Sequence, residues 1–202
     1  MSDYKSLDRC LCCNSTDIEI LLDLNNQPLA NSYHDNTKVM DEYPLGVNIC
    51  NNCYHIQLTH VVNPDLLFKD YLYVSGTTQT LHGNMKWFVD YVLEQTTFGK
   101  SNSVLDIACN DGTQLNYFKN EGFNTYGIDP AENLHKLSSK NHDVVCDYFN
   151  SDSVGDRVFD IITAQNVFAH NSNPKEFLDE CEKIMHDESV LYIQTSQAEM
   201  IL

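Results

Sequence analysis

The sequence predicts an α/β fold with a mainly parallel sheet, preceded by a small cysteine-rich α+β domain. From residue 103 onward, short apolar segments alternate with amphipathic ones, which is the pattern of βαβ units. Ahead of them, five of the eight cysteines gather within residues 10–13 and 50–53. We divide the chain into an N-terminal domain at residues 1–72 and a second domain at residues 73–202.

The composition excludes several classes of protein. The 202 residues include 12 Lys and Arg against 29 Asp and Glu, which gives a formal net charge of −17. Without a basic cluster the chain is not expected to bind nucleic acid, since such proteins neutralise phosphates with Lys and Arg. No apolar run approaches the ~20 residues of a membrane span, and the polar N-terminus lacks the apolar segment of a signal peptide. We therefore expect a cytoplasmic protein with no membrane partner.

Four cysteines form two C-x-x-C pairs, Cys10 with Cys13 and Cys50 with Cys53. In a reducing cytosol such pairs indicate metal ligation more than disulfides. Two tight loops with two thiolates each complete a tetrahedral zinc site that leaves no position for a substrate, so we expect the zinc to be structural. A redox dithiol is the alternative, but two pairs in one small module favour the metal. The scattered cysteines are interpreted as small core residues: Cys109, Cys146 and Cys181.

The apolar pattern also places the elements that precede the parallel sheet. In the first domain we expect a strand, a turn-rich insert, a second strand and a short helix, in the order 18–24, 25–44, 56–62 and 65–69. Residues 77–97 then carry apolar side chains at roughly helical spacing. We assign this longer helix to the second domain.

The second domain alternates five strands with three further helices. The strands are expected at residues 103–107, 124–128, 143–146, 159–164 and 190–195. The helices are expected near residues 111–121, 131–140 and 174–186. A right-handed crossover is assumed at each step, which keeps the strands parallel.

The first strand of this sheet ends in a turn that favours a nucleotide cofactor. Asp106 lies at the end of the strand, and Ala108, Asn110 and Gly112 follow at alternate positions, in the G-x-G-x-G style of S-adenosylmethionine (SAM) sites. Asp129 lies 23 residues after Asp106, at the end of the second strand, where a carboxylate can accept hydrogen bonds from both ribose hydroxyls. Because doubly wound folds bind ligands at the carboxyl ends of their strands, the two motifs predict one site.

Two more strand ends present polar side chains to the same crevice. Asp147 and Tyr148 follow the third strand, where the acid could meet the adenine amino group and the ring could cover its face, while Gln165 and Asn166 follow the fourth. Each motif alone is also typical of an ordinary β-to-α turn, but four such ends in a row favour a cofactor site. The predicted cofactor-binding residues are Asp106, Ala108, Asn110, Gly112, Asp129, Pro130, Asp147, Tyr148, Gln165 and Asn166.

Further motifs run along almost the whole chain: Cys10-x-x-Cys13, Gln27-Pro-Leu-Ala-Asn31, Tyr43-Pro-Leu45, Cys50-x-x-Cys53 with Gln57-Leu58, Tyr71-x-Tyr73-x-Ser75-Gly76, and residues 104–115, 126–133 and 166–170. In this order they resemble the zinc-containing, SAM-dependent sugar C-methyltransferases, which act on nucleotide-linked keto-deoxysugars. The resemblance implies a zinc-binding N-terminal domain that also helps to hold the substrate, a Rossmann-like SAM domain and a third, C-terminal domain.

Two departures from the family pattern bear on the prediction. Ala108 stands where many members have Gly, which matters only if the site needs a positive φ. The family also places a His-Glu-His stretch, which supplies the general base, and a further domain after the fifth strand. We expect these parts, and the last two strands of a seven-stranded sheet, to be absent from this sequence. This absence leads to the hypothesis that a separate chain supplies the missing parts.

The implied reaction is transfer of a methyl group from SAM to a nucleotide-linked deoxysugar, at a carbon next to a ketone. His170, after the fourth strand, is the candidate acid/base group, since an imidazole titrates near neutrality. By resemblance, Tyr73 and Tyr71 approach the sugar. Packing of the tyrosines and helix capping by His170 are the structural alternatives. Sugar O-methylation, a non-catalytic SAM- or sugar-binding subunit and a zinc-dependent protein-interaction module are the functional ones.

Overall fold

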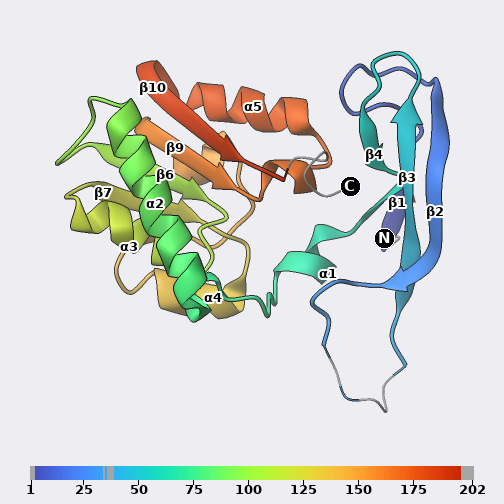
Figure 1. Cartoon of the computed structure of the whole chain (residues 1–202), viewed down its shortest axis with the longest axis horizontal. Helices are drawn as coiled ribbons and strands as arrows, with labels where there is room; N and C mark the ends of the chain where they lie inside the picture. The colour runs from blue at the N-terminus through green and yellow to red at the C-terminus, as the bar shows by residue number, and fades with distance from the viewer. Residues whose placement is uncertain (1–2, 34, 36–38, 197–202) are drawn as a thin grey trace. The chain divides into compact units, whose positions relative to one another are not determined.

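The computed structural model describes residues 3–33, 35 and 39–196. The chain forms two compact units (Figure 1). The first comprises the residues up to Tyr73 together with Ser172–Lys175, and the second comprises Val74–Asn171 and the residues from Glu176 onward. The first unit contains antiparallel strands, whereas the second contains a parallel sheet.

The first unit is built from β1 (Tyr4–Ser6), β2 (Ile18–Pro28), β3 (Glu42–Cys50), β4 (Ile56–Leu58), β5 (His60–Val62) and the short helix α1 (Pro64–Phe68). A three-stranded sheet has the order β2-β3-β4, and β1 pairs with β5. The Asn63 side chain caps α1, because its Oδ1 accepts a hydrogen bond from the Asp65 amide at 3.1 Å.

Two predictions for this unit were wrong. The segment predicted as turn-rich, residues 25–44, is partly strand: β2 continues through Pro28 and β3 begins at Glu42, because these two ends pair with each other. The single strand predicted at residues 56–62 is two strands, since β4 pairs with β3 and β5 pairs with β1. In both cases pairing with a distant segment decides the structure, and the local apolar pattern does not contain that information.

The second unit contains a five-stranded parallel sheet, which confirms the predicted α/β fold class. Its strands are β6 (Ser103–Ile107), β7 (Asn124–Ile128), β8 (Asp143–Val145), β9 (Phe159–Gln165) and β10 (Met185–Gln194). Their spatial order is β10-β9-β6-β7-β8, and every neighbouring pair is parallel. The first strand, β6, therefore lies between the second and the fourth. The winding reverses there, so the carboxyl ends of β6 and β9 border the switch point at which such folds bind ligands.

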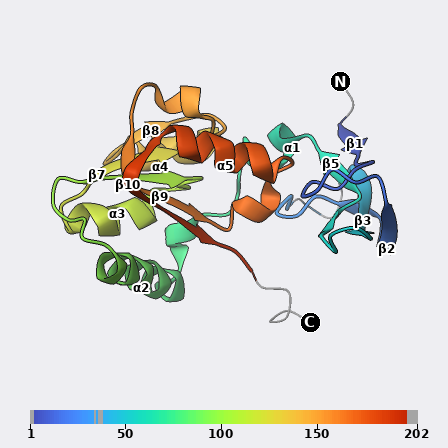
Figure 2. The same cartoon turned by 90° about the horizontal axis from the view of Figure 1, so that it is seen from above.

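Helices cover both faces of this sheet (Figure 2). In β6, Val104 joins a core cluster with the helices at residues 79–95 and 113–120, while the next residue, Leu105, joins a second cluster with the helix at residues 174–183 on the opposite face. Within the described residues, none of the helices combines the length and the hydropathy needed to cross a membrane. The helices are α2 (Gln79–Gln95), α3 (Thr113–Asn120), α4 (Glu132–Ser138) and α5 (Pro174–Lys183).

The boundaries in this unit differ by only a few residues from the predicted ones, with one exception. β6 and β7 have the predicted bounds, β8 is one residue shorter, β9 is one residue longer, and the helices are all shorter than expected. The exception is β10, which begins at Met185 and not at residue 190, with a register shift against β9 between Met185 and Val190. Cys109 and Cys181 are buried as predicted, but Cys146 is exposed, because it lies just after the short edge strand β8.

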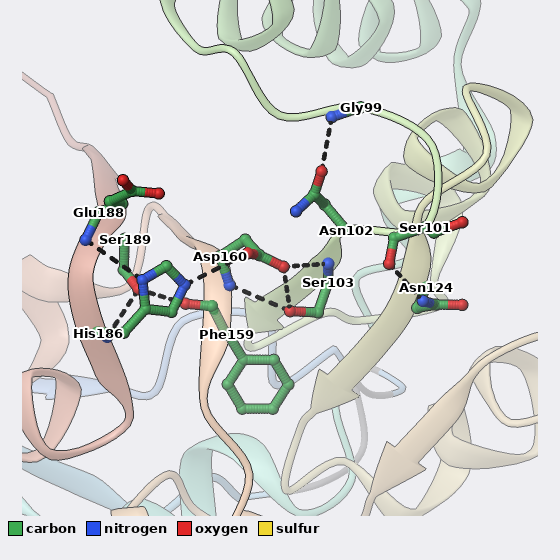
Figure 3. Close-up of polar contacts among 10 residues, drawn as sticks. All are labelled: Gly99, Ser101, Asn102, Ser103, Asn124, Phe159, Asp160, His186, Glu188 and Ser189. Atoms are coloured by element: carbon green, nitrogen blue, oxygen red, sulfur yellow. Dashed lines mark hydrogen bonds and ion pairs between the residues drawn. The ribbon is translucent and has the colours of Figure 1, made fainter.

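At the amino ends of the strands, a polar network ties β6, β9 and β10 together (Figure 3). Asp160 accepts hydrogen bonds from the amide and the hydroxyl of Ser103, at 2.6 and 2.8 Å, and its other oxygen lies 3.3 Å from Nε2 of His186. Burial raises the pKa of Asp160, but the hydrogen bonds from Ser103 oppose this effect and help to bring the pKa below its ordinary value. The network lies at the opposite end of the strands from the switch point, and it stabilises the sheet there.

Candidate functional site

The loop after β6, residues 108–113, has an unusual backbone, and we call it the cofactor loop. Ala108, Asn110 and Gly112 adopt φ angles of 60°, 53° and 80°, so every second residue is in the left-handed region. Such angles cost a residue with a Cβ roughly 1–2 kcal/mol and cost glycine little. The alternate-glycine pattern expected of SAM sites therefore marks the positions at which this turn needs left-handed residues. The replacement of glycine by Ala108 therefore matters, because the site does need a positive φ at this position.

Asp129, at the end of β7, lies against the cofactor loop. Its Oδ2 accepts a hydrogen bond from the Asn110 amide and its Oδ1 one from the Ala131 amide, both at 2.8 Å. The side chain is buried, and this burial raises its pKa even though the two amide bonds oppose the shift. Each carboxylate oxygen holds one backbone donor and retains lone pairs for another. The structure thus brings the two predicted motifs together, and the acid keeps the capacity to accept hydroxyl donors.

Asp106 lies inside the sheet beneath this loop. Its Oδ1 accepts a hydrogen bond from the hydroxyl of Thr163 on β9 at 2.7 Å, and the residue is only 4% exposed. Burial, with a smaller contribution from the charge of Asp129, raises the pKa of Asp106 to about 7 against the lowering effect of the Thr163 bond. Sequence reasoning did not find Thr163, because only the register of β6 with β9 places it opposite Asp106.

The two predicted residues at the end of β9 are held by different elements, Gln165 by α3 and Asn166 by β10. Gln165 donates from Nε2 to Oε1 of Gln114 on α3 at 2.9 Å, and Gln114 donates in turn to the Met85 carbonyl on α2 at 3.2 Å. Asn166 has a left-handed φ of 55°, and its amide donates to the Gln194 carbonyl at 2.8 Å. The buried Gln114 is a second residue that the sequence did not indicate, since a glutamine in a helix carries no such signal.

Three other predicted cofactor residues lie farther along the strand ends. Pro130 follows Asp129 directly and is partly exposed. Asp147 is exposed after the edge strand β8, and its Oδ1 accepts the amide of Tyr148 at 2.7 Å. The Tyr148 carbonyl accepts the hydroxyl of Ser153 at 3.2 Å, which packs this turn against η2 (Ser151–Val154).

The predicted catalytic residues are divided between the two units. His170 is exposed at the end of η3 (Phe168–His170) in the second unit, where its amide donates to the Val167 carbonyl at 2.9 Å. Tyr71 and Tyr73 belong to the first unit and meet edge to face, with ring centroids 6.2 Å apart. The Tyr71 hydroxyl also accepts the amide of Asn31 at 3.5 Å.

In the first unit the four predicted cysteines converge. The sulfurs of Cys10, Cys13, Cys50 and Cys53 all lie within 4.8 Å of one another, and two of the pairs, Cys10 with Cys53 and Cys13 with Cys50, are 3.6 Å apart. A tetrahedral zinc ion with bonds of about 2.3 Å needs sulfurs roughly 3.8 Å apart, so the donor set fits zinc. The side-chain amide of Asn52 lies 3.4 Å from Sγ of Cys13 and, with a backbone bond, lowers the pKa of that thiol to about 6.

The two cysteine turns have the same backbone structure. In the first, the Cys10 carbonyl accepts the amide of Asn14 at 2.9 Å; in the second, the Cys50 carbonyl accepts the amide of Tyr54 at 2.8 Å. Asn14 and Tyr54 have left-handed φ angles of 61° and 62°. Buried Gln57 holds the first turn, because its side chain accepts from the Leu11 amide and donates to the Arg9 carbonyl, at 2.8 and 2.9 Å. Two equivalent turns thus face each other across the thiolate cluster.

Comparisons with known families match both units. Residues 10–68 match the model described as "Putative zinc binding domain", and residues 81–200 match the model described as "Methyltransferase domain". The first match contains all four clustered cysteines, so the N-terminal region is a cysteine-rich zinc-binding region.

Individual relatives are also methyltransferases. The chain is 29% identical over 133 residues to C-methyltransferase NovU of Streptomyces niveus, over 64% of this chain and 32% of NovU. It is 29% identical over 119 residues to the ubiquinone biosynthesis O-methyltransferase of Glaesserella parasuis serovar 5 (strain SH0165), over 52% of this chain and 50% of that protein. The solved structure of the plantazolicin methyltransferase BpumL in complex with SAH is 25% identical, with a TM-score of 0.45 over 54% of this chain and 44% of that chain. This chain therefore spans half or less of the length of these relatives.

The methyltransferase model matches more than half of the chain, from α2 through β10, and this region includes the cofactor loop, Asp129 and the end of β9. The chain belongs to the methyltransferase domain family.

Proposed function

We propose that this chain is a SAM-dependent methyltransferase that modifies a nucleotide-linked deoxysugar at a carbon next to a ketone. The observation that carries the proposal is the left-handed cofactor loop joined to Asp129 at the switch point of the parallel sheet. When bound, SAM supplies an electrophilic methyl group on its sulfonium. The protein's contribution is to bind and orient the reactants and to move a proton.

In this proposal the strand ends share the recognition of the cofactor. The free lone pairs of Asp129 accept the ribose hydroxyls, and Asp147 and Tyr148 contact the adenine. Asp106 is also among the proposed cofactor-binding residues, and its hydrogen bond from Thr163 fixes its side chain near the end of β6. The other residues that we propose to bind the cofactor are Ala108, Asn110, Gly112, Pro130, Gln165 and Asn166.

The chemical step requires a base for the α-proton of the ketosugar. We assign this role to His170, which is exposed at the end of η3 and carries an imidazole, the side chain that most often serves as a general base. Removal of the proton leaves an enolate whose carbon is the nucleophile for the methyl group. Tyr73 and Tyr71 contact the sugar and help to hold it.

The name of NovU, a C-methyltransferase, supports carbon as the methyl acceptor, and that of the second relative supports an O-methyltransferase alternative. Solvent exchange distinguishes the two. Incubation of the nucleotide-linked ketosugar with the protein in deuterated water, without SAM, should label the α-carbon if the C-methylation route is correct. Labelling no faster than in a protein-free control, in a preparation that nevertheless methylates the sugar, favours the O-methyl route.

Binding of SAM itself is tested by isothermal titration of the zinc-loaded protein. Asp129→Ala should weaken binding by about 100-fold or more, because it removes two charge-assisted acceptors as well as the anchor of the Asn110 amide. The matched control is Asp152→Ala, since Asp152 is an exposed acid on η2. Absence of SAM binding to a correctly folded wild-type protein would overturn the proposal.

A further inference from the structure

The segment just before α2, residues 74–77, is bonded to the cofactor loop, and we call it the strap. It includes η1 (Ser75–Thr77). The Ser75 amide donates to Oδ1 of Asn110 at 2.9 Å, and the Gly76 amide donates to Oδ2 of Asp111 at 3.0 Å. Two consecutive backbone donors of the strap thus engage two consecutive side chains of the loop.

Gly76 lies so close to the loop that no side chain fits. A Cβ at this position would lie 2.3 Å from Oγ1 of Thr113 and 2.6 Å from Oδ2 of Asp111. The φ of Gly76 is −79°, so the need for glycine comes from contact and not from backbone conformation. Any larger residue must displace these two side-chain oxygens, and moving the Asp111 carboxylate breaks its hydrogen bond with the Gly76 amide.

His82 on α2 holds the strap from the other side. Its Nε2 lies 3.1 Å from the Gly76 carbonyl, and its Nδ1 lies 2.9 Å from the hydroxyl of Tyr117 on α3. Because a carbonyl oxygen can only accept, Nε2 carries a proton, and in the neutral ring Nδ1 then accepts from the Tyr117 hydroxyl. One neutral tautomer therefore satisfies both contacts and fixes the Gly76 carbonyl between the two helices.

The loop is consequently held on two sides at Asn110. The Asn110 amide donates to Asp129, and the Asn110 side chain accepts from the Ser75 amide of the strap. Asn110 is also one of the residues held at a positive φ, a conformation that the surrounding structure has to maintain.

We infer that the strap is a positioning element of the cofactor site: it holds the cofactor loop in its binding conformation, and His82 acts as a positioning residue through the Gly76 carbonyl. This inference rests on the proposed function, since the affinity it controls is that for SAM. Within the described residues, the strap's two hydrogen bonds to the loop come from backbone amides, so no polar side chain in its sequence indicates the contact.

The test compares Gly76→Ala with Gly83→Ala, in which the new methyl group on α2 meets nothing within 4 Å. Gly76→Ala should weaken SAM binding by about 10-fold or more in isothermal titration, and Gly83→Ala should leave it unchanged. His82→Leu should weaken binding several-fold, while His82→Gln, whose amide can donate to the Gly76 carbonyl, should restore part of the loss. Thermal unfolding of each variant checks that it is folded.

Hydrogen exchange without cofactor separates this inference from the proposed function. In Gly76→Ala, the amides of Asn110 and Gly112 should exchange at least about 10-fold faster than in wild type and in Gly83→Ala, because the loop is released. If wild type binds no SAM, the proposed function fails, and the exchange rates still decide whether the strap holds the loop. Unchanged exchange and unchanged SAM affinity in a folded Gly76→Ala protein would show that the strap has no positioning role.

Discussion

At the scale of single residues, the cofactor loop depends on an alanine in a conformation that suits glycine. Ala108 has a φ of 60°, and its amide donates to the Ile128 carbonyl at 2.7 Å. The bond from the Asn110 amide to Asp129 holds the next part of the turn. These contacts offset the strain at Ala108, so the turn forms without glycine at its first position.

Ala108→Gly should therefore stabilise the second unit by about 1 kcal/mol, because removal of the Cβ relieves the left-handed strain by more than the added flexibility costs. Denaturant unfolding measures the change, and SAM affinity should be equal or slightly higher. Ala131→Gly is the matched control: Ala131 is buried with an ordinary φ of −74°, so its loss should destabilise by about 1 kcal/mol. Equal destabilisation by both variants would show that Ala108 is not strained.

At the scale of elements, the sequence predicts what local pattern and local geometry determine. β6 and β7 have the predicted bounds, because each is short, ends in a tight turn and pairs along its whole length with the other. β3 was not predicted, since Pro44, Gly46 and Asn48 are poor strand formers. Its conformation is imposed by pairing with β2 on one side and β4 on the other.

In the candidate site, too, features set by local pattern were predicted and features set by distant contacts were not. Cysteine turns and the alternate small residues of the cofactor loop are local signals, and the structure brings both sets together. Thr163, Gln114 and the contact of the strap with the cofactor loop escaped prediction, because these contacts join segments more than 30 residues apart in the chain. The residues that we propose to contact a ligand thus leave a stronger signal in the sequence than the residues that position them.

The zinc-binding turns give a prediction for the first unit. Cys50→Ser should lose most of its zinc in elemental analysis and unfold the strands that the cluster joins, because Cys50 is fully buried and ends β3. Cys12→Ser should retain both zinc and structure, since Cys12 is exposed and lies outside the cluster. Equal loss of zinc in the two variants would mean that the ligand set is wrong.

At the scale of the whole molecule, the dominant property is negative charge. The first 70 residues carry 4 basic and 10 acidic side chains and the remainder carry 8 and 19, so both parts of the chain are acidic. The proposed reactants respond to this field in opposite ways. SAM has a net positive charge at neutral pH, because its ammonium and sulfonium outweigh its carboxylate, whereas a nucleoside diphosphate sugar is a dianion.

The two ligands should therefore show opposite salt dependence. Between roughly 10 and 150 mM salt, where the screening length falls from about 30 to 8 Å, the Kd of SAM should rise a few-fold and that of the nucleotide sugar should fall. S-adenosylhomocysteine, which lacks the sulfonium charge, is the matched control and should bind with nearly constant affinity. Titration calorimetry across the salt series measures all three. If salt weakens binding of the nucleotide sugar, local basic groups and helix amino ends govern its recognition. The repulsion from the net charge of −17 then does not control binding at the site.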